Sequence, residues 1–157
     1  MLRKIKPYAI SILIALGVGG LSALLTMGNM DIYDELVTPP LSPPSILFPI
    51  VWTALYILMG VSAAMVYKSG AAPYKEKTSA IAIYASSLVV NFAWSIIFFN
   101  LRAFLFSFIW LLFLFYLIIK TILAYKKIEP IAAYLQIPYA IWVAFAGYLN
   151  FGIWILN

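Results

Sequence analysis

The chain contains no cysteine and no histidine, and only 10% of its 157 residues are charged. Without cysteine it can form no disulfide, no thiol nucleophile and no thiolate metal site. Without histidine it lacks the commonest metal ligand and the commonest general base of proteins. We therefore expect no metal site and no cofactor. Soluble domains carry about 25% charged residues, whereas this chain is 66% hydrophobic, which is the composition of a polytopic membrane protein.

Long apolar runs are what the chain has in abundance. Five of them cover residues 8–27, 45–67, 79–99, 103–119 and 131–156. A helix of about 20 apolar residues crosses the hydrocarbon core of a bilayer, which is about 30 Å thick. The sequence therefore predicts an all-α integral membrane protein, a bundle of five transmembrane helices that forms one domain over residues 1–157.

Ionisable residues are missing from the interior of these runs. None contains Asp, Glu or Arg. Lys120 follows the fourth run, and we expect it in the last turn of that helix, from where its amine can reach the membrane surface. Proton-coupled pumps, ion carriers and voltage sensors need intramembrane ionisable groups. The sequence therefore argues against ion-coupled transport.

The basic residues predict the topology. Five spans place nine of the ten basic residues on one side and only Arg102 on the other. Because Lys and Arg collect on the cytoplasmic side, we expect a cytoplasmic N-terminus and an external C-terminus. The acidic, proline-rich loop between the first two runs would then be external. We expect this loop to be solvated and stiffened by its prolines, and to form a lid over the bundle. The same asymmetry favours a prokaryotic cytoplasmic membrane and gives no reason to expect a nucleic-acid partner.

Aromatic and amide side chains share faces on three of the predicted helices. Such rings, with small and neutral polar residues, are the usual lining of a pocket for a flat apolar ligand. Membrane aromatics also commonly face lipid, which we favour for Trp110 and Trp154, and spacing alone favours an interhelical hydrogen bond for Asn91. The shared faces hold Trp52 and Tyr56, then Asn91, Trp94, Ser95 and Phe98, and then Trp142, Ala146, Leu149 and Asn150.

Small residues recur at four-residue spacing on two runs, which permits close helix contact. Ala15, Gly19 and Ala23 form one such stripe, and Ala82 and Ser86 form the other. Each stripe can serve packing inside the bundle or contact between two protomers.

Three segments of the chain resemble the TspO/MBR family, the translocator proteins also called peripheral-type benzodiazepine receptors. They are TPPLSPPSILFPIVWTALYILMG at residues 38–60, NFAWSIIFF at 91–99 and PYAIWVAFAGYLNF at 138–151. The resemblance extends over essentially the whole chain, and the chain is similar to bacterial members of the family. It implies a five-helix bundle, often a homodimer, with a ligand cavity under the first loop.

The resemblance also implies ligands and site residues. Family ligands include porphyrins such as protoporphyrin IX, sterols and synthetic benzodiazepines. The implied dimer face holds Ala82 and Ser86. Porphyrin photo-oxidation in some bacterial members implies a catalytic part for Trp52 and Trp142. The implied ligand-binding residues, with face-sharing Tyr56 and Phe98 added, are Tyr33, Trp52, Tyr56, Asn91, Trp94, Phe98, Phe106, Trp142, Ala146 and Asn150.

The chain departs from the family pattern at several positions. Thr38 and Leu41 replace a lysine and a tryptophan of the first loop, and Ser95-Ile96 follows Trp94 where the family has x-Pro. No basic residue follows Tyr148, which predicts weak sterol binding. The leading hypothesis is a porphyrin receptor that acts in transport, sequestration or signalling. The alternatives are a light- and oxygen-dependent porphyrin-degrading enzyme, a passive transporter of lipophilic solutes such as sterols, and a membrane protein with no small ligand.

Overall fold

The computed structural model describes residues 1–157, and helices form all of its regular structure. Five helices are long and apolar enough to cross a membrane. The prediction of an all-α bundle with five membrane-spanning helices is therefore confirmed. The five are α1 (Leu2–Thr26), α3 (Leu47–Lys68), α4 (Tyr74–Ser95), α5 (Phe104–Ile128) and α6 (Pro130–Leu156).

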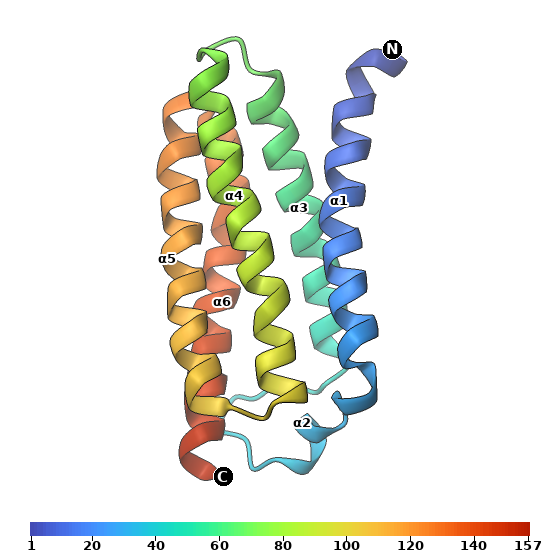
Figure 1. Cartoon of the computed structure of the whole chain (residues 1–157), viewed down its shortest axis with the longest axis vertical. Coiled ribbons are helices and arrows are strands. Elements are labelled where there is room, and N and C mark those ends of the chain that lie inside the picture. Colours follow the sequence, from blue (N-terminus) through green and yellow to red (C-terminus); the bar gives the residue numbers. More distant parts are fainter.

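Short elements occupy two of the connections. A 3-10 turn (Met27–Asn29) and the single-turn helix α2 (Ile32–Glu35) lie in the first loop. A π-helical turn (Ile96–Asn100) extends α4 into the tight connection to α5. Figure 1 shows α2 and this turn at the end of the bundle that carries the C-terminus, and the N-terminus at the opposite end.

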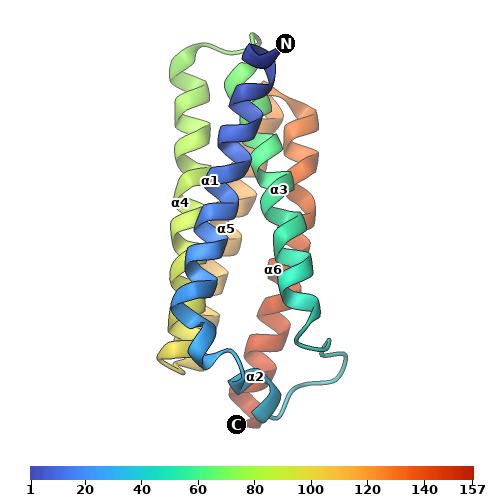
Figure 2. The same cartoon turned by 90° about the vertical axis from the view of Figure 1, so that its right-hand side faces the viewer.

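The five long helices form a closed ring in the order α1, α3, α6, α5 and α4, because each packs on the next and α4 returns to α1. Figure 2 shows α1 and α3 close together near the N-terminal end and diverging towards the end that carries α2. The α3–α4 and α5–α6 connections lie at the N-terminal end (Figure 1). The fold thus brings the predicted basic segments to one end of the bundle.

The helices extend past the predicted spans where polar residues flank the apolar runs. The fourth run was expected to end at Ile119, but α5 continues to Ile128 and includes three lysines. Lys120 is therefore not in a last helical turn, and its amine lies 5.5 Å from the centre of the Tyr116 ring. The length of an apolar run indicates how much of a helix lies in the membrane and does not show where the helix ends. Lysine is a good helix former, so the helix continues beyond the apolar run. In α6 the helix continues through Pro138.

Two glycines bring α1 and α3 into close contact. A Cβ at Gly60 would lie 2.5 Å from the Ile12 Cα, and a Cβ at Gly19 would overlap the ring of Tyr56. Ala15, one turn before Gly19, is fully buried. This part of the α1 stripe therefore packs inside the bundle. Ala82 and Ser86 on α4 are exposed, and the Ser86 hydroxyl donates to the Ala82 carbonyl at 2.9 Å. That stripe faces outwards, where lipid or a second protomer would contact it.

Candidate functional site

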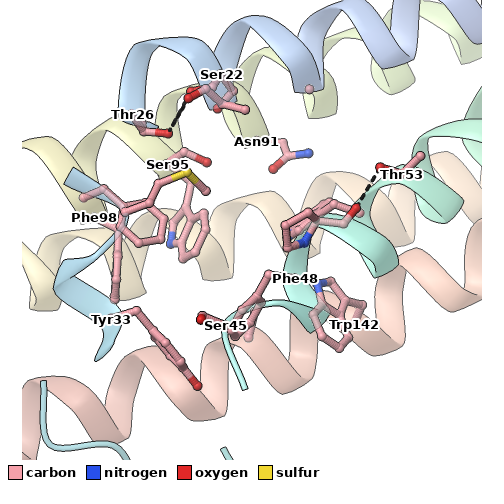
Figure 3. A pocket seen from close by; sticks show the side chains of 18 of the residues that line it. Ser22, Thr26, Tyr33, Ser45, Phe48, Thr53, Asn91, Ser95, Phe98 and Trp142 are labelled. Carbon is pink, nitrogen blue, oxygen red and sulfur yellow. Dashed lines mark hydrogen bonds between the residues drawn. The ribbon is translucent and has the colours of Figure 1, made fainter. Parts of the chain in front are cut away.

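A cavity of about 580 Å³ opens where α1 and α3 diverge, beneath α2. This volume lies within the range of small-molecule sites, about 300–1,000 Å³. Four of the long helices, α1, α3, α4 and α6, contribute side chains to its wall. The short helix α2 and the π-helical turn also contribute. In Figure 3, Asn91, Phe98 and Trp142 converge on the space from α4, the π-helical turn and α6.

Two groups of packed aromatic rings line the α3 and α6 side of the cavity. Trp52 stacks on Tyr56 with ring centres 5.7 Å apart, and its edge meets Tyr139 at 6.2 Å. Phe48 lies one turn before Trp52. Its ring packs on the Trp142 ring, with ring centres 5.8 Å apart, and on the Tyr33 ring, with ring centres 4.9 Å apart. Each aromatic pair adds about 0.5–1.5 kcal/mol beyond the burial of its area, so this wall is held in place before any ligand binds.

Asn91 places an amide in the cavity wall. Its side-chain nitrogen donates to the Tyr56 hydroxyl at 3.1 Å, and the residue is 2% exposed. The interhelical hydrogen bond that the spacing favours is therefore present. Asn91 also lines the cavity, where Figure 3 shows its amide beside the open space. One amide thus connects α4 to α3 and faces the space that a ligand would fill.

Asn150 has a different environment from Asn91, although the sequence pattern treats the two alike. Its oxygen accepts from the Trp94 indole at 3.1 Å and from the Ser107 hydroxyl at 3.0 Å. Its nitrogen donates to the Phe104 carbonyl at 2.8 Å, and the residue is 1% exposed. These bonds use its amide oxygen and one of its N–H groups inside the bundle, and they fix the orientation of Trp94.

The indole nitrogen of Trp142 is buried and has no hydrogen-bond partner within the protein. A buried N–H without an acceptor costs about 1–3 kcal/mol. Trp142 also lines the cavity. Because this nitrogen has almost no accessible surface, Trp142 presents carbon atoms rather than its N–H to the cavity.

The loop over the cavity is attached to the C-terminal end of α6. Tyr148 donates from its hydroxyl to the Pro40 carbonyl at 2.7 Å, and the Asn157 side chain exchanges two hydrogen bonds with Val37, at 3.0 and 2.8 Å. Pro39 is buried against Gly152, where a Cβ would lie 2.6 Å from the proline ring. These contacts hold the loop across the bundle end in the position of a lid.

Tyr33 of α2 closes the cavity from the loop side. Its hydroxyl donates to the Pro43 carbonyl at 2.9 Å. Burial raises the pKa of the Tyr33 phenol above its ordinary value of 10.0, the Ser42 side chain lowers it by less, and the Asp34 carboxylate raises it further. Tyr33 therefore keeps its proton, and with it this hydrogen bond, throughout the physiological pH range.

The structure brings nine of the ten predicted ligand-binding residues to this one cavity and leaves out the tenth. Phe106 is not part of the wall: it is 52% exposed and packs on Trp110 with ring centres 6.0 Å apart. It lies on the outer side of α5, and α5 contributes no side chain to the cavity. Whether the nine bind a ligand stays a prediction. They are Tyr33, Trp52, Tyr56, Asn91, Trp94, Phe98, Trp142, Ala146 and Asn150.

Other lining residues were not predicted. Phe48 precedes Trp52 by four residues, a spacing that would have placed both on one helix face. Ser22 and Thr26 belong to α1, whose cavity-facing side carries no aromatic residue, so nothing in its sequence marked it. Asp31 and Asp34 were read as solvated loop residues, but they also line the cavity mouth.

Fold and cavity together define a class: a five-helix integral membrane protein with an aromatic cavity beneath a loop at one end. Residues 9–155 match the model of the TspO/MBR family. The chain is 35% identical to the tryptophan-rich protein TspO of Chlorobaculum tepidum, over 100% of this chain and 99% of the relative. It is 32% identical to that of Archaeoglobus fulgidus, over 98% and 99%. It is 34% identical to the translocator protein of Bos taurus, over 87% and 81%.

The chain belongs to the TspO/MBR family. It is an integral membrane protein, as its five apolar helices and its relatives show, and its bacterial relatives indicate a prokaryotic membrane. Its relatives carry names such as translocator protein and tryptophan-rich sensory protein. Family membership therefore supports a binding or regulatory role in the membrane.

Proposed function

We propose that this protein binds porphyrins and similar flat lipophilic molecules in the cavity beneath α2, and that it acts in tetrapyrrole transport, sequestration or signalling. The observation that carries the proposal is the cavity of about 580 Å³ with three tryptophans in its wall. Trp52 and Trp142 belong to one ring-lined side of it, and Trp94 stacks on Phe98 on the other, with ring centres 5.3 Å apart. Ring surfaces of this kind are what a planar macrocycle would stack on, which supports the proposal.

The energetics support reversible binding. Burial of apolar surface contributes about 25 cal/mol per Å², and loss of ligand freedom offsets part of it. We expect micromolar affinity. Because the chain has no histidine and no cysteine to bind iron, free porphyrin should bind as well as haem. A clear preference for haem would contradict the proposed recognition through rings and amides.

The test is a titration of purified protein with protoporphyrin IX in detergent, in the dark, monitored by tryptophan fluorescence. Saturable quenching at micromolar ligand is expected, and Trp52→Phe and Trp142→Phe should each weaken it. Trp154→Phe is the matched control, because Trp154 is 41% exposed and is not part of the cavity wall. Absent or non-saturable quenching would remove the tetrapyrrole hypothesis.

Light- and oxygen-dependent porphyrin breakdown is a second candidate. The presence of two indoles, Trp52 and Trp142, in the same wall favours it, since an excited porphyrin generates reactive oxygen next to oxidisable rings. Illumination of the titrated samples in air should then give a new product spectrum that depends on both residues. If a Trp52→Phe/Trp142→Phe variant degrades porphyrin as fast as the native protein, free photochemistry explains the reaction.

A homodimer through α4 is part of the proposal. Its support is the outward-facing pair Ala82 and Ser86, where the absence of large side chains lets a second helix approach closely. Val89 on the same helix is 68% exposed, which extends this apolar face. Replacement of Ala82 by Leu should dissociate the dimer in a cross-linking assay and leave porphyrin binding unchanged.

A further inference from the structure

Where α1 packs against α4, the cavity wall carries hydroxyl and amide groups. Ser22 and Thr26 belong to α1, and Asn91 and Ser95 belong to α4. Each pair is four residues apart, so its members share a helix face. Figure 3 shows all four across the space from Phe48 of the aromatic side. We call these four side chains the polar corner.

Two hydroxyls of the polar corner are not used by the protein. Thr26 donates to the Ser22 carbonyl at 2.9 Å, as hydroxyls in helices commonly do. The hydroxyls of Ser22 and Ser95 have no such partner, and neither is among the polar atoms that packing seals off from all contact. Both residues line the cavity, and Figure 3 shows the Ser95 oxygen on the cavity side of α4. Their hydroxyls are therefore available to a bound molecule.

Asn91 adds an acceptor to these two donors. Its amide nitrogen is engaged with the Tyr56 hydroxyl at 3.1 Å. Its amide oxygen has no partner within the protein and is not sealed off by packing. In Figure 3 this oxygen lies on the side of the amide that faces Ser95. The polar corner thus offers hydroxyl donors and an amide acceptor to the same part of a ligand.

A protonated carboxyl group complements this set. Its carbonyl oxygen accepts from the serine hydroxyls, and its O–H donates to the Asn91 oxygen. An apolar cavity favours the neutral form of a carboxyl group, and a neutral acid needs no counter-charge, which suits a lining without lysine or arginine. An ionised carboxylate at the mouth would instead lie near the like charges of Asp31 and Asp34.

We infer that the polar corner binds a carboxyl group of the porphyrin in its protonated form, and that Ser22 and Ser95 are specificity residues for porphyrins that carry such a group. The inference rests on the proposed function, since it names the part of the ligand that the same cavity recognises. The aromatic side of the cavity can stack on any porphyrin macrocycle, so discrimination between carboxyl and alkyl substituents falls to the polar corner.

The test compares protoporphyrin IX with octaethylporphyrin, a porphyrin that carries only alkyl groups. Both are titrated in the dark, in an uncharged detergent, into native protein and a Ser22→Ala/Ser95→Ala variant. Each lost hydrogen bond lowers affinity about twofold to tenfold. Protoporphyrin IX should therefore bind the variant about tenfold more weakly, while octaethylporphyrin changes by less than twofold. The ratio of the two affinities is compared between proteins, so that unequal partition of the ligands into micelles cancels.

Thr53→Val is the matched control. Thr53 also brings a hydroxyl to the cavity lining, from α3, but this hydroxyl donates to the Pro49 carbonyl at 2.7 Å. The control should leave the ratio of the two affinities unchanged. A second measurement tests the protonation state: the infrared spectrum of bound protoporphyrin IX at neutral pH should contain the C=O stretch of a protonated carboxyl group, and this band should weaken or shift in the Ser22→Ala/Ser95→Ala variant.

The possible failures can be told apart. If both porphyrins bind the native protein and the double variant leaves their ratio unchanged, the inference is wrong and the proposed binding function stands. The same holds if the variant weakens both ligands equally, because the serines would then shape the cavity without recognising a carboxyl group. Bound protoporphyrin IX with only ionised carboxylates would also refute the inference. If neither porphyrin binds saturably, the proposed function fails together with it.

Discussion

Asn150→Ala tests whether this asparagine holds the bundle together rather than contacting a ligand. The change removes three hydrogen bonds, from the Trp94 indole, from the Ser107 hydroxyl and to the Phe104 carbonyl. The three losses are unequal. Ser107 also donates to the Phe104 carbonyl at 2.8 Å, so these two groups retain a partner in each other. Only the Trp94 indole loses its one partner.

The magnitude follows from these contacts. Hydrogen bonds between membrane helices average about 0.6 kcal/mol in double-mutant cycles, so three of them contribute about 2 kcal/mol. The orphaned Trp94 donor makes this a lower bound, since a buried unsatisfied group costs about 1–3 kcal/mol. For a chain of this size, 1 kcal/mol corresponds to about 2–4 °C in Tm. We therefore expect the Tm of Asn150→Ala to fall by at least about 4–8 °C.

The assay is thermal unfolding in detergent without ligand, with Asn91→Ala as the matched control. Asn91 gives up one hydrogen bond, to Tyr56, so its Tm should fall by less than half as much. Porphyrin affinity should show the reverse order, because Asn91 faces the cavity. Equal Tm losses for the two variants would refute the distinction. A Trp94→Phe change in the Asn150→Ala background should be less than additive, because the shared hydrogen bond is lost only once.

Three further variants test packing, the lid and buried polar groups. Gly60→Ala should lower Tm because its Cβ meets the backbone of α1, while Gly17→Ala, which meets nothing within 4 Å, should leave Tm equal or higher. Gly152→Ala should displace Pro39 and speed porphyrin dissociation in stopped-flow measurements without a large loss of Tm. Tyr84→Phe should raise Tm, since it removes a buried hydroxyl without a partner. A lower Tm for the last variant would show that a bound water satisfies that hydroxyl.

How much of this site the sequence could predict depends on the type of signal. Helical spacing identifies residues on a shared face, so Trp52 with Tyr56, and Trp142 with Ala146, were placed correctly in one wall. Spacing does not say whether a face points to the cavity or into the bundle. Asn91 and Asn150 each follow the same pattern of an amide near a tryptophan, and only the packing of α5 against α6 directs Asn150 inwards.

Other features depend on contacts that no local pattern records. Phe106 was assigned to the ligand site, but α5 lies on the far side of the ring from the opening and turns Phe106 outwards. Hydropathy marked the end of the fourth span at Ile119, since charge interrupts an apolar run long before it ends a helix. Asp31 and Asp34 are exposed, as expected of a solvated loop, but a loop sequence does not show that they also border a cavity.

Tyr56 connects the stability of the bundle to the existence of the cavity. Its ring occupies the space that Gly19 leaves on α1, which brings α1 and α3 together on one side of this contact. Its hydroxyl accepts the Asn91 amide, which adds α4 to the same level of the bundle. Beyond Tyr56, towards the end that carries α2, α1 and α3 separate and the cavity opens with Trp52 stacked above the ring. The floor of the cavity is thus also the point where three helices are joined. A larger residue at position 19 should therefore change the depth of the cavity and the stability of the bundle together.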